Sequence, residues 1–82
     1  MLMQLFTIFD EAAQESGEVF MAKNRATAKR FFDLGLAKIA DVSKKDYSLF
    51  HLGQYDTEKM EITVVEPMKV HLNVNDDVEV ML

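Results

Sequence analysis

The sequence predicts an α+β domain in which a single helix packs on a mostly antiparallel sheet, in the order β-β-α-β-β-β. Three observations support this prediction. Only residues 24–40 combine helical spacing of apolar side chains with a length that excludes a strand. The other apolar stretches are short, and most of them alternate with polar residues. The connections between them are also short, which favours antiparallel neighbours and one domain spanning residues 1–82.

The first two predicted strands are residues 3–9 and 18–23. Residues 3–9 place apolar side chains on both alternating faces, which is typical of a strand that is covered on both sides. Residues 10–17 are polar and end in Ser-Gly, so we expect them to reverse the chain through a loop or one helical turn. If this connection is a hairpin, the second strand runs antiparallel to the first.

The predicted helix, residues 24–40, carries an apolar stripe along one side. The members of the stripe are Ala28, Phe31, Phe32, Gly35, Leu36 and Ile39. We expect Phe31 or Phe32 to pack on the sheet together with Ile39. Asn24 is the expected N-cap, because its side-chain oxygen can accept from an amide of the first turn. Gly35 costs about 1 kcal/mol relative to alanine in a helix interior, so we expect the helix to approach the sheet closely there.

The third predicted strand is residues 47–55. Gly53 within it indicates a bulge or a place where another backbone comes close. Residues 56–59 are expected to form a four-residue hairpin turn, which leads to a fourth strand at residues 60–65.

The C-terminal part of the chain predicts one or two further strands. Pro67 has no amide hydrogen, so it belongs at the start of a strand or at a sheet edge. Residues 68–74 alternate apolar and polar side chains and form the fifth predicted strand. Residues 75–77 are a turn, after which residues 78–82 can form a sixth strand at the edge.

Composition excludes several classes of protein. With 49% hydrophobic and 28% charged residues, the chain is typical of a soluble globular domain rather than a disordered one. It has no cysteine, so disulfides and thiolate metal sites are excluded, as is usual in a reducing cytosol. No apolar run reaches the roughly 20 residues of a membrane span. Residues 1–13 lack a basic segment and run into acidic residues, so we expect a strand there and not a signal peptide.

The net charge of −5 argues against non-specific binding to nucleic acid, but the charge is unevenly distributed. Seven of the nine Lys and Arg residues lie between positions 23 and 45, where two Asp leave a segment charge of +5. Residues 1–22 carry −4 and residues 46–82 carry −6. Two interpretations remain open. The basic helix and the acidic strands are either complementary solvated faces of one domain, or the helix presents a basic face to a polyanion.

Candidate catalytic and metal-binding residues are few. His51 and His71 each lie within a strand pattern, and their spacing does not require a metal. The carboxylates at residues 56–58 and 76–77 lie where turns collect Asp and Asn, and they lack the spacing of a calcium loop. The three glycines are too far apart for a phosphate loop. We therefore expect no enzyme activity, no metal and no cofactor.

The aromatic residues suggest a different kind of site. Proteins that bind single-stranded nucleic acid stack bases on exposed aromatic rings beside a basic groove. Tyr47 and Tyr55 are expected to share one face of the third strand, with Lys44 and Lys45 next to them. The alternative is that the phenylalanines form the core and the tyrosines a half-buried rim.

One segment carries a family resemblance. Residues 46–56, DYSLFHLGQYD, follow the helix and are preceded by Ser43. Together with the opening FTIFD and with Pro67, they resemble the small non-structural protein of gokushovirus-type microviruses, which are tailless phages with single-stranded DNA. The resemblance covers about residues 6–67. It departs from the family at Glu18-Val19, where a proline pair is usual, and in the acidic tail.

The resemblance implies a non-enzymatic phage protein in the host cell cytoplasm that assists viral DNA replication. Its expected role is single-stranded DNA binding in the shift from duplex replication to single-strand synthesis and packaging. Together with the charge and aromatic patterns, it predicts a DNA-binding set of Lys23, Arg25, Lys29, Arg30, Lys44, Lys45, Tyr47 and Tyr55. The alternative is an interaction module that binds a host or phage protein, such as a replication protein, and does not contact DNA. We expect no membrane association.

The apolar ends of the chain also predict self-association. Met1, Leu2 and Met3 stand at one end, and Val80, Met81 and Leu82 stand at the other. Extending a sheet across a two-fold axis would bury such ends. We therefore expect a homodimer formed through an edge strand, one from residues 68–82.

Overall fold

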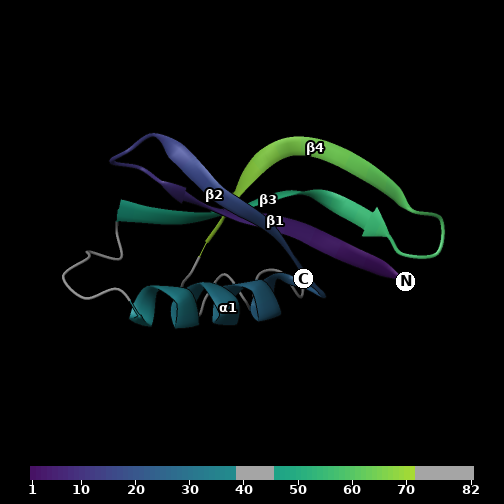
Figure 1. Ribbon diagram of the computed structural model, residues 1–82, viewed down its shortest axis with the longest axis horizontal. Coiled ribbons are helices and arrows are strands. Elements are labelled where there is room, and N and C mark those ends of the chain that lie inside the picture. Colours follow the sequence, from purple (N-terminus) through teal and green to yellow (C-terminus); the bar gives the residue numbers. More distant parts are fainter. Residues whose placement is uncertain (39–45, 72–82) are drawn as a thin grey trace.

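The computed structural model describes residues 1–38 and 46–71, and within them it contains one helix and four strands (Figure 1). These elements are β1 (Leu2–Asp10), β2 (Glu15–Ala22), α1 (Arg25–Ala37), β3 (Tyr47–Asp56) and β4 (Glu61–Val70). The strands form one sheet in the order β2-β1-β3-β4, and each neighbouring pair is antiparallel. Helix α1 lies against one side of this sheet (Figure 1). The predicted α+β class is confirmed.

Two predicted strands are partly merged in the structure. Residues 61–65 of the predicted fourth strand and residues 68–70 of the predicted fifth belong to the single strand β4, which pairs with β3. The pairing moves from Val64 opposite Gly53 to Met68 opposite His51, so the extra residues of β4 form a bulge that contains Pro67. Pro67 thus lies in an edge strand of the described sheet, as predicted. The rest of the fifth strand, the following turn and the sixth strand were predicted at residues 72–82, which lie outside the described residues.

Both hairpin turns are held by an aspartate at the end of a strand. Asp10 accepts hydrogen bonds from the backbone amides of Ala12 and Ala13, at 3.0 and 3.1 Å. Asp56 accepts from the amides of Glu58 and Lys59 in the same way, at 3.0 and 3.3 Å. Such side-chain bonds replace the ladder bonds that the chain gives up when it turns. The predicted role of Asp56 as a turn residue is confirmed, and β2 begins three residues earlier than predicted, at Glu15.

The hydrophobic core lies between α1 and the sheet. The buried apolar residues are Phe6, Ala22, Ala28, Phe32, Leu36, Leu49 and Val70. Three of these come from the predicted stripe of the helix, which confirms the side that faces the sheet. The N-cap is also confirmed, because the Asn24 side chain accepts from the Thr27 amide at 2.9 Å.

Two details of the helix differ from the prediction. Phe32 is buried, whereas Phe31 is 57% exposed and stacks on Phe20 at a ring distance of 4.7 Å. Ile39 lies outside the described residues. The expectation of a close approach to the sheet at Gly35 is wrong, because a methyl group placed there would meet no atom of residues 1–38 or 46–71 within 4 Å. The helical spacing located the stripe, but it could not say which of its members touch the sheet.

The bulge predicted at Gly53 is present and changes the course of β3. Leu5 pairs with Gly53 and Phe6 with His51, which leaves Leu52 as the extra residue of β3. Gly53 has a φ of 151°, and a Cβ there would collide with the carbonyl group of Thr63 in β4. Both features require glycine. From Gly53 onward, each side chain of β3 lies on the face opposite to the one that strict alternation from Tyr47 would give it.

Candidate nucleic-acid interface

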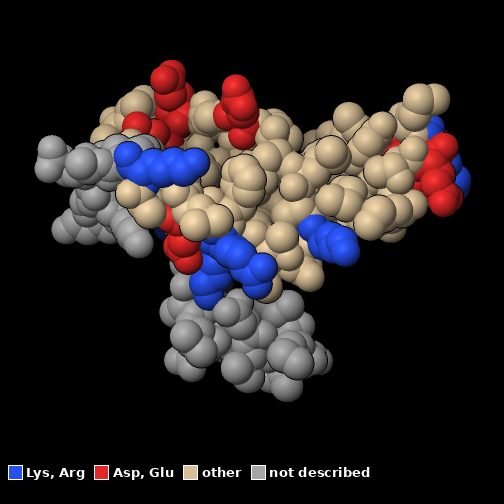
Figure 2. Space-filling model, turned by 60° about the horizontal axis from the view of Figure 1, so that its bottom comes forward, with Lys and Arg blue, Asp and Glu red and all other residues tan. Residues whose placement is uncertain are grey.

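The cations of the basic segment gather on the helix side of the molecule. Arg25, Lys29 and Arg30 belong to α1, and Lys23 directly precedes its cap. Figure 2 shows most Lys and Arg side chains on the side turned forward, in separate places and with an acidic side chain beside the central group, whereas most Asp and Glu lie at the upper edge and at the right-hand end. Lys23 and Arg30 are exposed, whereas Arg25 and Lys29 are half-buried. The structure thus brings four of the six predicted cations to one side of the fold.

A polar hollow of about 310 Å³ lies where α1 begins. It is lined by Gln4, Phe6, Lys23, Asn24, Arg25 and His51. Within it, the His51 Nε2 and Gln4 Oε1 atoms are 2.9 Å apart, so these two side chains fix each other's orientation. The Arg25 guanidinium lies 3.5 Å from the sulfur of Met68. Two cationic side chains and an imidazole therefore share one concave site.

The electrostatics of this site favour an anion. The first turn of α1 contains no acidic residue, although the partial positive charge at a helix N-terminus normally favours one. Lys23 and Arg25 add two cations at the same end. Neither Lys23 nor Arg30 forms an ion pair with a carboxylate in residues 1–38 or 46–71. Lys23 and Arg25 repel each other at this end of the helix, and a phosphate bound in the hollow would offset that repulsion.

The two tyrosines do not share a face, and this expectation is wrong. Tyr47 is half-buried and packs against the core on the helix side. Tyr55 pairs with Met3, on the opposite face of the sheet, because the bulge at Leu52 shifts the alternation of β3. A single stacking platform made by both rings is therefore excluded. Lys44 and Lys45 lie outside the described residues.

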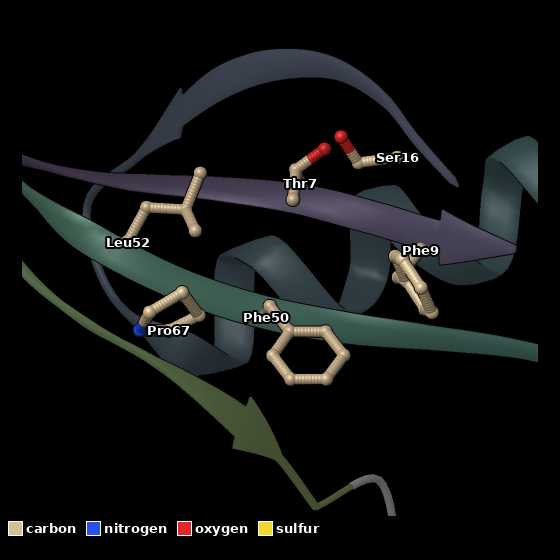
Figure 3. A pocket seen from close by; sticks show the side chains of 6 residues that line it. All are labelled: Thr7, Phe9, Ser16, Phe50, Leu52 and Pro67. Atoms are coloured by element: carbon tan, nitrogen blue, oxygen red, sulfur yellow. The ribbon is translucent and has the colours of Figure 1, made fainter. Parts of the chain in front are cut away.

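The sheet has a second side, away from α1, which we call the open face. The apolar side chains that line its two hollows are those of Leu5, Phe9, Val19, Phe50, Leu52, Ile62, Val64, Val65 and Pro67. Figure 3 shows part of it, with the labelled side chains in front of the strands and the helix behind them. The Phe9 and Phe50 rings meet edge to face at 5.9 Å. No helix or strand of residues 1–38 and 46–71 packs on this side.

The described residues offer little for catalysis or metal binding. No three His, Asp or Glu side chains among them come together as a metal site would require. His51 contacts Gln4 and the Phe6 ring rather than a carboxylate. The Glu11 carboxylate accepts from the Ser48 hydroxyl at 2.7 Å, but a carboxylate is too weak a base to activate a serine hydroxyl by itself. Residues 76–77 lie outside the described part of the chain.

The comparison with protein families decides what this chain is related to. Residues 3–78 match the model of a family described as Phage ORF5 protein. The chain belongs to the Phage ORF5 family. No curated protein and no solved structure matches it. No helix in the described part of this family member is long and apolar enough to cross a membrane.

Membership in the Phage ORF5 family confirms that the chain is a phage protein, as the resemblance implied. The assignment to gokushovirus-type microviruses is finer than the family match and stays a prediction. Two features of this family member were not predicted from its sequence. His51 and Gln4 join the polar hollow only through the pairing of β1 with β3, which no local pattern specifies. The open face was hinted at by the two apolar faces of residues 3–9, but we expected both to be covered.

Proposed function

We propose that this phage protein binds single-stranded DNA without catalysis and assists the shift from duplex replication to single-strand synthesis and packaging in a gokushovirus-type microvirus. The observation that carries the proposal is the polar hollow at the start of α1, where Lys23, Arg25 and His51 converge. Family membership supports a phage role and does not by itself identify DNA as the ligand.

In this proposal, a backbone phosphate occupies the hollow. Lys23 and Arg25 supply charge, and the N-terminal end of α1 adds its partial positive charge. Arg30 lies farther along the exposed side of the helix and would contact a neighbouring phosphate. The acidic hairpins repel the strand and confine it to the helix side. With few cations in reach, the affinity is low and strongly dependent on salt.

The tyrosines have a smaller role than the sequence suggested. Tyr47 is partly committed to the core, and Tyr55 lies on the opposite side of the sheet from α1. A strand bound along α1 cannot stack on both rings. The proposal therefore rests on phosphate contacts, which give little preference for base sequence.

The test is fluorescence anisotropy of a labelled oligothymidine, titrated with the protein at several salt concentrations. Each phosphate contact contributes a slope of about −0.7 in log affinity against log salt for single strands. Replacing Lys23 with glutamate should weaken binding and flatten the slope. The matched control is Lys59→Glu, which makes the same charge change at the exposed β3–β4 turn, far from the hollow. It should change affinity much less.

If Lys23→Glu and Lys59→Glu lowered the affinity for oligothymidine equally, net charge alone would determine binding. The hollow would then not be the binding site. If the wild-type protein binds no single-stranded DNA even at low salt, the proposal is overturned. The alternative, an interaction module that binds a host or phage protein such as a replication protein, would then take its place.

A further inference from the structure

The open face is a continuous apolar trough. Two hollows lie on it, of about 300 and 490 Å³, and Leu52 and Pro67 line both. The smaller hollow lies between β1 and β3 near the Phe9–Phe50 pair, and the larger one lies beside Ile62 and Val64 of β4. Strands β2 and β4 bow away from α1 (Figure 1), as expected of strands that carry bulges. Side chains from all four strands line the two hollows.

The trough exposes large side chains to water. Ile62 is 63% exposed, Val64 is 77% exposed and Val19 is 58% exposed. The Thr7 hydroxyl, a polar group within the trough, is already engaged, because it donates to the carbonyl oxygens of Gly17 and Glu18 at 3.1 Å. A contiguous exposed apolar surface of this kind marks an interaction site.

We propose that the open face is the interface of a homodimer in which the sheets of two copies of this chain stack face to face. The charge distribution favours a second copy as the partner. None of the residues that line the two hollows is charged, although each chain carries −5. Two equally acidic chains repel, and they meet at least cost where neither presents a charge. Lys69 lies opposite Phe50 and so shares this face, but it stands in the edge strand β4, outside the two hollows. The uncharged apolar centre is self-complementary, as a two-fold interface requires.

The size of the face is adequate for a stable dimer. Four strands spaced about 4.8 Å apart, each about 30 Å long, give a footprint of roughly 600 Å² before the relief of the side chains is counted. A standard interface buries about 800 Å² of accessible surface on each partner. Stacked sheets pack roughly 10 Å apart with interdigitating side chains, and hollows such as those beside Leu52 accept them.

The edges of the described sheet are less suited to pairing than its open face. Strand β4 contains Pro67, which lacks an amide hydrogen, and it is bulged. Strand β2 is also irregular, because its register with β1 shifts between Thr7 and Phe9. Proline and bulges are the features with which sheet edges avoid pairing. The proposed dimer therefore differs from the edge-strand dimer that the apolar ends of the chain predict.

Sedimentation equilibrium of the full chain tests the proposal. We expect a mass of twice 9.4 kDa that persists or strengthens as salt increases, because salt screens the repulsion between the two acidic chains. Val64→Lys should raise the dissociation constant roughly tenfold or more, since a lysine would have to lose its hydration in the interface. This variant reduces the negative charge of each copy, so added repulsion cannot explain the loss.

Leu34→Lys is the matched control, because Leu34 is 62% exposed on α1 and a lysine introduced there should leave the dimer intact. Ile62→Lys is a second interface variant in case Val64→Lys fails to fold, as judged by circular dichroism. A monomeric mass at all concentrations overturns the proposal. A dimer that dissociates in the Leu34→Lys variant also overturns it. The same holds for a dimer that neither Val64→Lys nor Ile62→Lys weakens, which is the result expected of an edge-strand dimer.

The two proposals fail separately. In a dimer of stacked open faces, both copies of α1 lie on the outside, and the hollow beside Lys23 stays accessible. The Val64→Lys variant should therefore still bind oligothymidine, and the Lys23→Glu variant should still form the dimer. Loss of DNA binding without loss of the dimer leaves the interface in place, and the reverse result leaves the DNA proposal in place.

Discussion

The two faces of the sheet carry similar side chains but differ in how much of them is buried. On the side of α1, Phe6, Phe32 and Leu49 are almost completely buried. On the open face, Ile62 and Val64 are mostly exposed. Both faces arise from the same alternation along the strands, and a single helix can cover only one of them. The comparison teaches that the helix side supplies the stability of the monomer, whereas the apolar content of the open face is available for assembly.

The largest effect should come from Phe32→Ala on the helix side. Phe32 is buried between α1 and the sheet, so its removal leaves a cavity and should cost about 3–5 kcal/mol in the free energy of unfolding. That amount is enough to unfold a domain of this size. Urea denaturation followed by circular dichroism measures it. Phe31→Ala is the control, because this ring is mostly exposed and stacks only on Phe20, so we expect a loss of about 1 kcal/mol. Equal losses would contradict the assigned orientation of the helix.

A second prediction concerns the bulge that divides β3 between the two faces. Gly53→Ala should destabilise the protein by about 1–3 kcal/mol, because φ is 151° and the added methyl group would collide with the Thr63 carbonyl. The measurement is again the urea midpoint. If the loss is genuine strain at the β3–β4 contact, hydrogen exchange should speed up in β4 before it does in β1. An unchanged midpoint would mean that the two strands are farther apart than the structure places them.

How much of this could be predicted depends on whether the deciding interaction is local. The Asn24 cap, the Asp56 turn and the edge position of Pro67 follow from the chemistry of a few neighbouring residues, and all three were predicted. The faces of β3 were not, because the bulge at Leu52 depends on its register with β1 and β4.

The candidate site follows the same division. Its cations were predicted from a charge pattern along the chain, which needs no knowledge of the fold. The hollow that joins Lys23 and Arg25 to His51 needed the pairing of strands that are distant in sequence. The stacking pair failed for this reason, since Tyr47 and Tyr55 were assigned to one face by strict alternation. Sequence patterns locate charges along the chain, whereas strand register decides which side chains meet.

The smallest predicted effect has the opposite sign to that of Gly53→Ala and tests the helix side directly. The sequence suggested that Gly35 allows α1 to approach the sheet, in which case alanine would clash and destabilise. In the described part of the chain, no atom lies within 4 Å of a methyl group placed at Gly35. Gly35→Ala should then stabilise the protein by about 0.5–1 kcal/mol, because alanine has the higher helix propensity and restricts the unfolded chain. A raised urea midpoint with an unchanged slope is the expected result. A lowered midpoint would show that α1 lies closer to the sheet than described. The helix side would then be packed more tightly around Gly35 than the structure shows.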